Sequence, residues 1–187
     1  METLLGLIIG TGLSAACGFR VFVPLLGTSI AAMSGHLHLA QGFEWVGSWP
    51  ALVAFSLATL LEVVAYFIPW FDHVMDSIAA PAAVVAGTVL TASLVGDVSP
   101  FLRWSLAIIA GGAVAGTTQL GTMALRTVSS AFTGGIGNPE VSAGELAGST
   151  VMTLLALFLS VVGFILAVVI CLLALKSLRK KRLAAST

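Results

Sequence analysis

The sequence predicts an all-α, polytopic helical membrane protein that folds as one domain. Of its 187 residues, 58% are hydrophobic and 9% are charged, whereas about a quarter of the residues of a soluble domain are charged. The hydrophobic residues also gather in about five long apolar segments, as expected of a chain that crosses a bilayer repeatedly. These segments cover residues 4–33, 50–68, 73–95, 102–125 and 146–175.

The first segment, residues 4–33, is too long for one simple crossing and carries Arg20 near its midpoint. A charge at the centre of a membrane helix costs ~3 kcal/mol or more unless it is paired. Gly18 and Pro24 flank this arginine and favour an interruption of the helix. We therefore expect a break or strong bend between Gly18 and Pro24, either as a kink or as a re-entrant hairpin of two half-helices.

The three middle segments suit single crossings, because a membrane span needs about 20 residues. Tryptophan is most stable at a membrane surface, and all four tryptophans lie near the expected ends of these segments: Trp45, Trp49, Trp70 and Trp104. The last segment, residues 146–175, is longer, and we expect it to cross once with a tilt or a protruding end. Residues 1–175 then form the transmembrane domain.

A basic tail at residues 176–187 follows the last segment. It contains five of the eight basic residues: Lys176, Arg179, Lys180, Lys181 and Arg182. The positive-inside rule places this tail in the cytoplasm, and such a run is more typical of a membrane flank than of a nucleic-acid site. With one crossing for each later segment, residues 127–145 are expected on the opposite, outer face.

Three glycine pairs have the Gly-x-x-x-Gly spacing, which lets two helix backbones approach closely. They are Gly6 with Gly10, Gly112 with Gly116, and Gly144 with Gly148. The spacing predicts tight helix packing. It leaves open whether the partner helix belongs to the same chain or to a second copy in a homo-oligomer.

The expected topology gathers polar residues at one pole of the bundle: Asp72, Asp76, Arg126, Asn138 and Glu145. Asp72 and Asp76 are four residues apart, so their carboxylates share one helix face. Two like charges on one face repel unless a cation, an arginine or a proton lies between them. With His73 they form a candidate divalent-metal site, and an interfacial histidine without a metal is the competing interpretation.

Glu62 lies six residues before the end of the second segment, roughly 9 Å deep at the helical rise per residue. An acid inside a span indicates a functional site, and a structural ion pair with Arg20 is the alternative. In either case we expect Glu62 to point into the bundle, within hydrogen-bond or one-water reach of Arg20 or Arg126.

Several stretches resemble the bacterial membrane family named domain of unknown function 4126. They are "SAACGFRVFVPLL" (14–26), "EVVAYFIPWFDHVMDSIAAPAAVVAGTVLTAS" (62–93), "SPFLRWSLAIIAGGAVAG" (99–116) and "ALRTVSSAFTGGIGNPEVSAGELAGS" (124–149). The resemblance implies a bacterial cytoplasmic membrane protein and brings no established activity. The residues at its motif positions are Arg20, Glu62, Pro69, Asp72, Asp76, Pro81, Arg126, Asn138, Pro139 and Glu145.

Three functions remain open. The first is a transporter or channel-like protein for an ion or small solute, with a buried charged pocket of Arg20, Glu62, Asp72, Asp76, Arg126 and Glu145. The second is a non-catalytic membrane subunit or scaffold whose charges are structural ion pairs. The third is a metal-dependent lipid-modifying enzyme that uses Asp72 and Asp76. No Ser-His-Asp or Cys-His arrangement and no phosphate-binding glycine loop are legible, so an enzyme is not favoured, and the sequence does not identify a cofactor.

Overall fold

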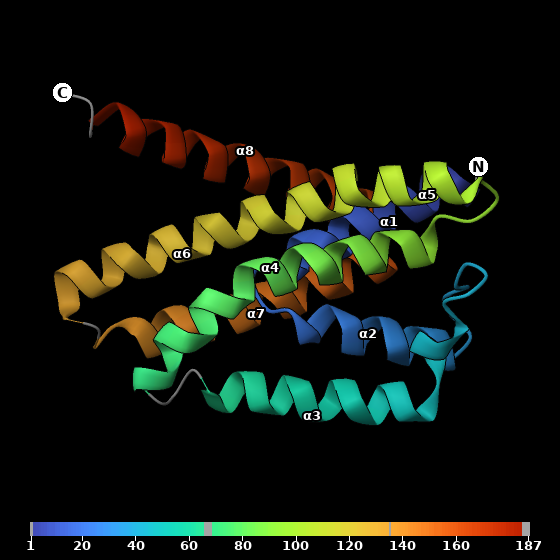
Figure 1. The fold of residues 1–187 in the computed structure, drawn as a ribbon, viewed down its shortest axis with the longest axis horizontal. Coiled ribbons are helices and arrows are strands. Elements are labelled where there is room, and N and C mark those ends of the chain that lie inside the picture. The colour runs from blue at the N-terminus through green and yellow to red at the C-terminus, as the bar shows by residue number, and fades with distance from the viewer. Residues whose placement is uncertain (1, 66–68, 135, 185–187) are drawn as a thin grey trace.

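The computed structural model describes residues 2–65, 69–134 and 136–184, with side chains over the same ranges except for residues 69–77 and 179–184. Helices account for most of these residues, and no strand occurs among them (Figure 1). The helices are α1 (Glu2–Cys17), α2 (Phe22–Met33), α3 (Trp49–Ala65), α4 (Pro69–Leu94), α5 (Pro100–Leu106), α6 (Ala113–Thr133), α7 (Asn138–Phe158) and α8 (Ser160–Ala184). A short 3-10 turn, η1 (Glu44–Gly47), precedes α3, and a π-helical turn, η2 (Ala107–Gly112), joins α5 to α6.

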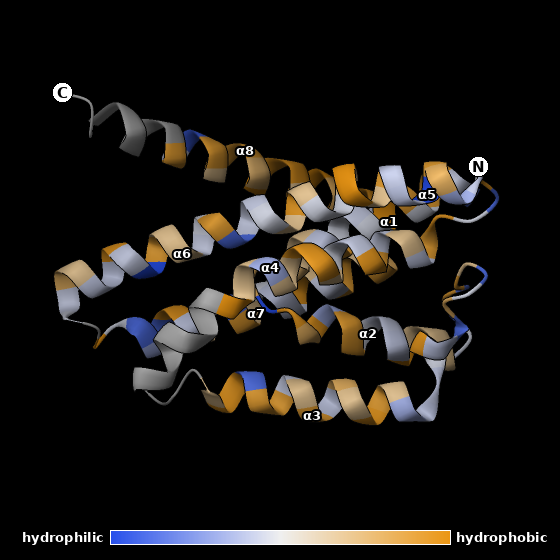
Figure 2. Ribbon diagram, viewed as in Figure 1, coloured by the Kyte–Doolittle hydropathy of each residue, from blue (hydrophilic) through white to orange (hydrophobic). Residues whose placement is uncertain are grey.

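The exterior of the bundle is apolar, as a bilayer requires. Three helical stretches are long and apolar enough to cross a membrane: Pro100–Thr133, Asn138–Phe158 and Ser160–Leu178. Large aliphatic side chains such as Leu61 on α3 and Leu172 on α8 are mostly exposed, and Figure 2 shows the hydrophobic colour spread along both helices. These features confirm a polytopic helical membrane protein.

The first apolar segment forms a re-entrant hairpin. Helix α1 ends at Cys17, α2 begins at Phe22, and the two run in opposite directions, so the chain returns to the end of the bundle at which it began (Figure 1). Both half-helices pack on α7, since Gly12 lies against Ala156 and Gly27 against Thr153. The predicted break is therefore confirmed, as a hairpin rather than as a kink.

The later helices run the length of the bundle and define two ends. The N-terminal end comprises the start of α1 and the loops at residues 34–48 and 95–99. The C-terminal end comprises the starts of α4 and α7 and the ends of α6 and α8 (Figure 1). Between the two ends, Leu13 of α1 and Leu90 of α4 are completely buried in an apolar core to which Leu25 of α2 also belongs.

The expected single crossing at residues 146–175 is wrong. The chain turns sharply at Leu159, and α8 runs back beside α7. The helices touch at the turn, where a Cβ on Gly163 would lie 2.8 Å from Cα of Ala156. Because α7 and α8 are two antiparallel helices, the start of α7 and the end of α8 lie at the same end. The expectation that the tail and residues 127–145 lie on opposite faces is therefore also wrong.

Most of the paired glycines pack within the chain. Gly6 and Gly10 of α1 lie against α4, where a Cβ on Gly10 would be 2.8 Å from Cα of Thr91. Gly112 and Gly116 also face α4, and Gly148 lies beside Phe19. Gly144 has open space around it within the described part of the chain. Tight packing is thus explained by intrachain contacts for the first two pairs.

Candidate functional site

The interruption between α1 and α2 brings Arg20 into the protein interior, where it is 2% exposed. Its Nη2 donates a hydrogen bond to the backbone oxygen of Ser142 at 2.9 Å and lies 3.7 Å from Oε2 of Glu145. Hydroxyl groups hold the interrupted backbone: Ser149 donates to the Ala16 oxygen at 3.0 Å, and Thr122 donates to the Gly18 oxygen at 3.4 Å. Side chains from α6 and α7 thus donate hydrogen bonds to carbonyl groups at the end of α1, although the Ala16 oxygen also accepts from the amides of Phe19 and Arg20.

Arg126 of α6 and Glu145 of α7 form a buried, bidentate ion pair. The Nε of Arg126 donates to Oε1 of Glu145 at 2.9 Å, and its Nη2 contacts Oε2 of the same carboxylate. The same Nη2 donates to the hydroxyl of Ser142 at 3.1 Å. Paired N–H donors on one carboxylate give both strength and a fixed geometry. Glu145 therefore lies between two arginines, because Arg20 approaches its Oε2 as well.

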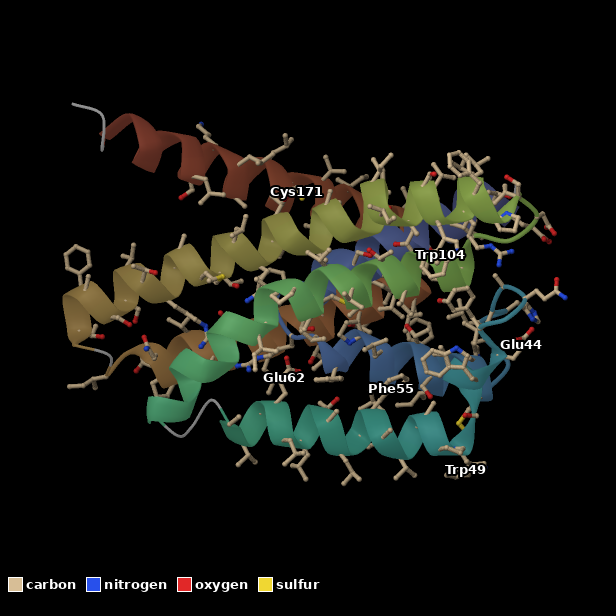
Figure 3. The ribbon with its side chains drawn as sticks, viewed as in Figure 1. Glu44, Trp49, Phe55, Glu62, Trp104 and Cys171 are labelled. Carbon is tan, nitrogen blue, oxygen red and sulfur yellow. The ribbon has the colours of Figure 1, made fainter. Side chains whose placement is uncertain are left out.

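Glu62 of α3 binds the beginning of α2. Its two carboxylate oxygens accept hydrogen bonds from the backbone amides of Val21, at 2.8 Å, and Phe22, at 3.1 Å. These amides start a helix whose macrodipole favours a negative charge at this position. Figure 3 shows Glu62 on the side of α3 that faces the bundle. Among the described residues its hydrogen-bond partners are these backbone amides. Arg20 is near enough to interact with Glu62 electrostatically, while its ion-pair contact is with Glu145.

The charged cluster consists of Arg20, Glu62, Arg126 and Glu145, two cations and two anions from four separate parts of the chain. Arg126 lies seven residues before the end of α6, and Glu145 lies seven residues after the start of α7. At 1.5 Å per residue, the cluster is roughly 10 Å inside the C-terminal end. It therefore lies within the two stretches whose length and composition suit a membrane crossing, Pro100–Thr133 and Asn138–Phe158.

The remaining predicted site residues lie nearer to the C-terminal end. Asn138 begins α7, one helical turn before Ser142, and its Nδ2 donates to the hydroxyl of Ser130 at 3.1 Å. The side chains of Asp72, His73 and Asp76 lie outside the described part of the structure; the backbone of α4 that carries them starts at the same end. Elsewhere in the described residues, no group of three His, Cys, Asp or Glu side chains could hold a metal. The metal site at Asp72, His73 and Asp76 stays a prediction.

Sequence reasoning missed the hydroxyl and amide residues around the cluster. Their signal was present, because helical spacing of three and four places them on one face of each helix. On α6 the buried polar face comprises Thr118, Gln119, Thr122 and Arg126. On α7 it comprises Ser142, Glu145, Ser149 and Thr153.

A cavity of about 730 Å³ opens at the N-terminal end. It is lined by the start of α1, the 36–41 loop and the 96–99 loop, and it reaches Ile9. Eight residues separate Ile9 from Cys17 at the tip of the hairpin, or about 12 Å along the helix axis. The cavity and the charged cluster therefore approach the middle of the bundle from opposite ends, with apolar core between them.

Comparison with known proteins gives one match. A family model described as domain of unknown function (DUF4126) matches residues 7–180, whereas no curated protein and no solved structure matches the chain. The matched range includes the hairpin, all four residues of the charged cluster and the α7–α8 turn. The chain therefore belongs to the DUF4126 family.

Proposed function

We propose that this protein transports a small ion or solute across the membrane, through the interior between the α1–α2 hairpin, α6 and α7. The observation that carries the proposal is the convergence of Arg20, Glu62, Arg126 and Glu145 at a broken helix inside the apolar body. Charges inside a membrane are costly and commonly mark an ion or substrate pathway. Broken helices whose half-helix ends face a polar centre are a recurring feature of transporters.

The arrangement supports a closed conformation of such a pathway. The polar faces of α6 and α7 extend from the charged cluster past the hairpin tip, and the cavity enters from the other end. Leu13, Leu25 and Leu90 pack between them. Movement of the hairpin against α6 and α7 would break the hydrogen bonds that Thr122 and Ser149 donate to the hairpin backbone.

The orientation proposed here follows the basic tail. The five Lys and Arg residues after residue 175 support a cytoplasmic location for the C-terminal end of the bundle. The charged cluster is then nearer to the cytoplasmic surface, and the 730 Å³ cavity faces outward. We assign the protein to the cytoplasmic membrane of a bacterial cell, as the family resemblance implies.

The transport proposal is tested with purified protein in liposomes on a solid-supported membrane, after concentration jumps of H⁺, Na⁺, K⁺ and chloride. We expect at least one jump to give a current that protein-free liposomes lack. The double variant Arg126→Met/Glu145→Met should abolish that current, because it removes one cation and one anion from the pathway. Currents equal to those of protein-free liposomes for every ion would contradict transport of these four ions, and unchanged currents in the double variant would contradict a pathway through the charged cluster.

The second candidate is a non-catalytic scaffold, and the mutual pairing of Arg126 with Glu145 favours it. Replacing a buried pair by well-packed apolar residues is often neutral for stability, so the current of the wild-type protein, and not the folding of the double variant, distinguishes the two functions. Under this interpretation the double variant folds, gives the same absence of current as the wild type, and leaves any association of the protein with other membrane proteins intact.

A further inference from the structure

Two acidic residues, on neighbouring segments of the chain, line the cavity at the N-terminal end. Glu2 lies at the start of α1, and Asp97 lies in the loop after α4. These segments are joined by a hydrogen bond from the hydroxyl of Thr3 to the backbone oxygen of Gly96 at 3.2 Å. Asp97 has a φ of 54°, a left-handed conformation that Asp and Asn adopt more readily than other non-glycine residues.

Basic groups and N–H donors come from a second pair of segments. Arg103 of α5 donates from Nη1 to the backbone oxygen of Gln41 at 3.1 Å, which joins α5 to the loop that carries His36 and His38. Arg103 also lines the cavity, and a guanidinium offers N–H donors that suit an oxyanion. A neutral imidazole also offers one N–H donor.

We propose that this cavity binds a zwitterionic group in which a phosphate or carboxylate lies close to a primary ammonium. The oxyanion would bind Arg103 and the two histidines, and the ammonium would bind Glu2 and Asp97. An oxyanion alone would lie beside the two carboxylates with no cation of its own to offset their negative charge. A metal ion is a poor occupant, because no group of three ligand side chains could hold one among the described residues. The cavity volume of about 730 Å³ lies within the ordinary range for small-molecule sites.

Two sources of this chemistry are available, a phosphatidylethanolamine headgroup and a free zwitterionic solute. A membrane surface near this end is indicated by three exposed tryptophans. Trp49 and Trp104 lie at this end of the bundle (Figure 3), and Trp45 belongs to η1, which precedes α3. Ligand binding at this site is measured without any ion flux, so its test is independent of the proposed transport activity.

Calorimetric titration of the protein in a maltoside detergent tests the proposal with O-phosphoethanolamine as the probe. Inorganic phosphate and ethanolamine, each carrying one half of the zwitterion, should bind at least 10-fold more weakly. In a parallel experiment, native mass spectrometry of protein released from nanodiscs compares retention of phosphatidylethanolamine with retention of phosphatidylglycerol. Binding of the free compound identifies a solute site, and selective retention of phosphatidylethanolamine alone identifies a headgroup site. Failure of both, or binding of phosphate as tight as that of phosphoethanolamine, overturns the proposal.

Matched variants locate the site. Asp97→Asn removes the charge while keeping a residue that tolerates the left-handed backbone, and Arg103→Gln removes the cation. Each should weaken binding of the preferred ligand at least 10-fold. The controls are Glu140→Gln and Lys176→Gln, which make the same charge changes at exposed positions outside the cavity. A circular dichroism melt checks that Arg103→Gln folds. Wild-type affinity in Asp97→Asn would overturn the proposal whether or not Arg103→Gln folds.

Discussion

Single polar side chains hold the broken helix of this protein in place. Glu62 supplies acceptors for the first amides of α2, and Ser149 and Thr122 supply donors for carbonyl groups at the end of α1. Buried backbone groups without partners are costly in a bilayer, where water cannot replace them. Each of these side chains therefore stabilises the hairpin in a way that an apolar residue of the same size could not.

Replacement of Glu62 should measure this effect. Glu62→Gln keeps one acceptor oxygen and removes the negative charge from the beginning of α2, so we expect a loss of ~1–3 kcal/mol in the free energy of unfolding. Thermal unfolding in detergent provides the measurement. Glu140→Gln is the control, because Glu140 is an exposed acid in the first turn of α7 and its loss should cost less than ~1 kcal/mol. Equal midpoints for the two variants would contradict the role given to Glu62.

Substitutions of Arg126 and Glu145 should be strongly coupled in their effects on the free energy of unfolding. Arg126→Met leaves the carboxylate of Glu145 with less compensation in a buried site, and breaking such a pair typically costs ~3–5 kcal/mol. Adding Glu145→Met should restore most of that loss, since the cluster then keeps one cation and one anion among its described side chains. Chemical unfolding of the two single variants and the double variant forms the cycle that measures the coupling. Additive losses would show that the pair does not act as a unit.

At the scale of helices, close backbone approach is the main packing device. The α1–α4 contact is made by glycine on one side and backbone or threonine on the other, as at Gly10 and Thr91. Ser14 adds a hydrogen bond from its hydroxyl to the Gly87 backbone oxygen at 2.8 Å. Between membrane helices, such contacts replace the hydrophobic driving force that operates in water.

Two glycine substitutions should therefore have opposite effects. Gly6→Ala places a methyl group on the backbone oxygen of Leu94, so the helices must separate, and we expect a loss of ~2 kcal/mol or more. Gly144→Ala meets open space and should stabilise α7 by up to ~1 kcal/mol through helix propensity. Unfolding midpoints in detergent compare the two. Size-exclusion chromatography with light scattering adds a second result: a Gly144→Ala variant that dissociates from a dimer to a monomer would show that this face binds a second copy.

For the whole molecule, the α7–α8 turn determines which segments share a side of the membrane. Cysteines introduced at Thr133 and Ala184 should react from one side with an impermeant maleimide, and a cysteine at Glu44 should react from the other. With the proposed orientation, Glu44→Cys is labelled in intact cells and the other two only after lysis. Thr133→Cys and Ala184→Cys on opposite sides would contradict the antiparallel arrangement of α7 and α8.

The sequence was sufficient to predict the membrane class, the break near Arg20 and the shared end of Arg126 and Glu145. These features follow from charged residues inside apolar segments, a pattern that can be read directly from the sequence. The α7–α8 turn was missed because "ALFLSVVGFIL" (156–166) has no proline, no charge and nearly uniform hydropathy. The turn depends on the contact of Gly163 with Ala156, and a single glycine in an apolar run does not distinguish a hairpin from a straight helix.

The hydrogen-bond partners of Glu62 were beyond sequence reasoning. Arg20 was a visible candidate and interacts with Glu62 electrostatically, but the hydrogen bonds come from the backbone amides of Val21 and Phe22. Every residue except proline has such an amide, so only the position of the helix start decides which ones are available. Ser142 and Ser149, by contrast, could have been found, since they lie on the same helical face as Glu145.

The separation of Arg20 from its partner along the chain has a consequence for biosynthesis. Ser142, which accepts its hydrogen bond, is 122 residues further on. At ordinary translation rates of 5–20 residues per second, the ribosome needs roughly 6–24 s to make that interval. During this time Arg20 lacks its contacts with Ser142 and Glu145, and the first hairpin must wait for α7 near the membrane surface or on an insertion factor. A nascent chain arrested before α7 should therefore leave α1 and α2 open to protease digestion, and one arrested after α7 has emerged should protect them.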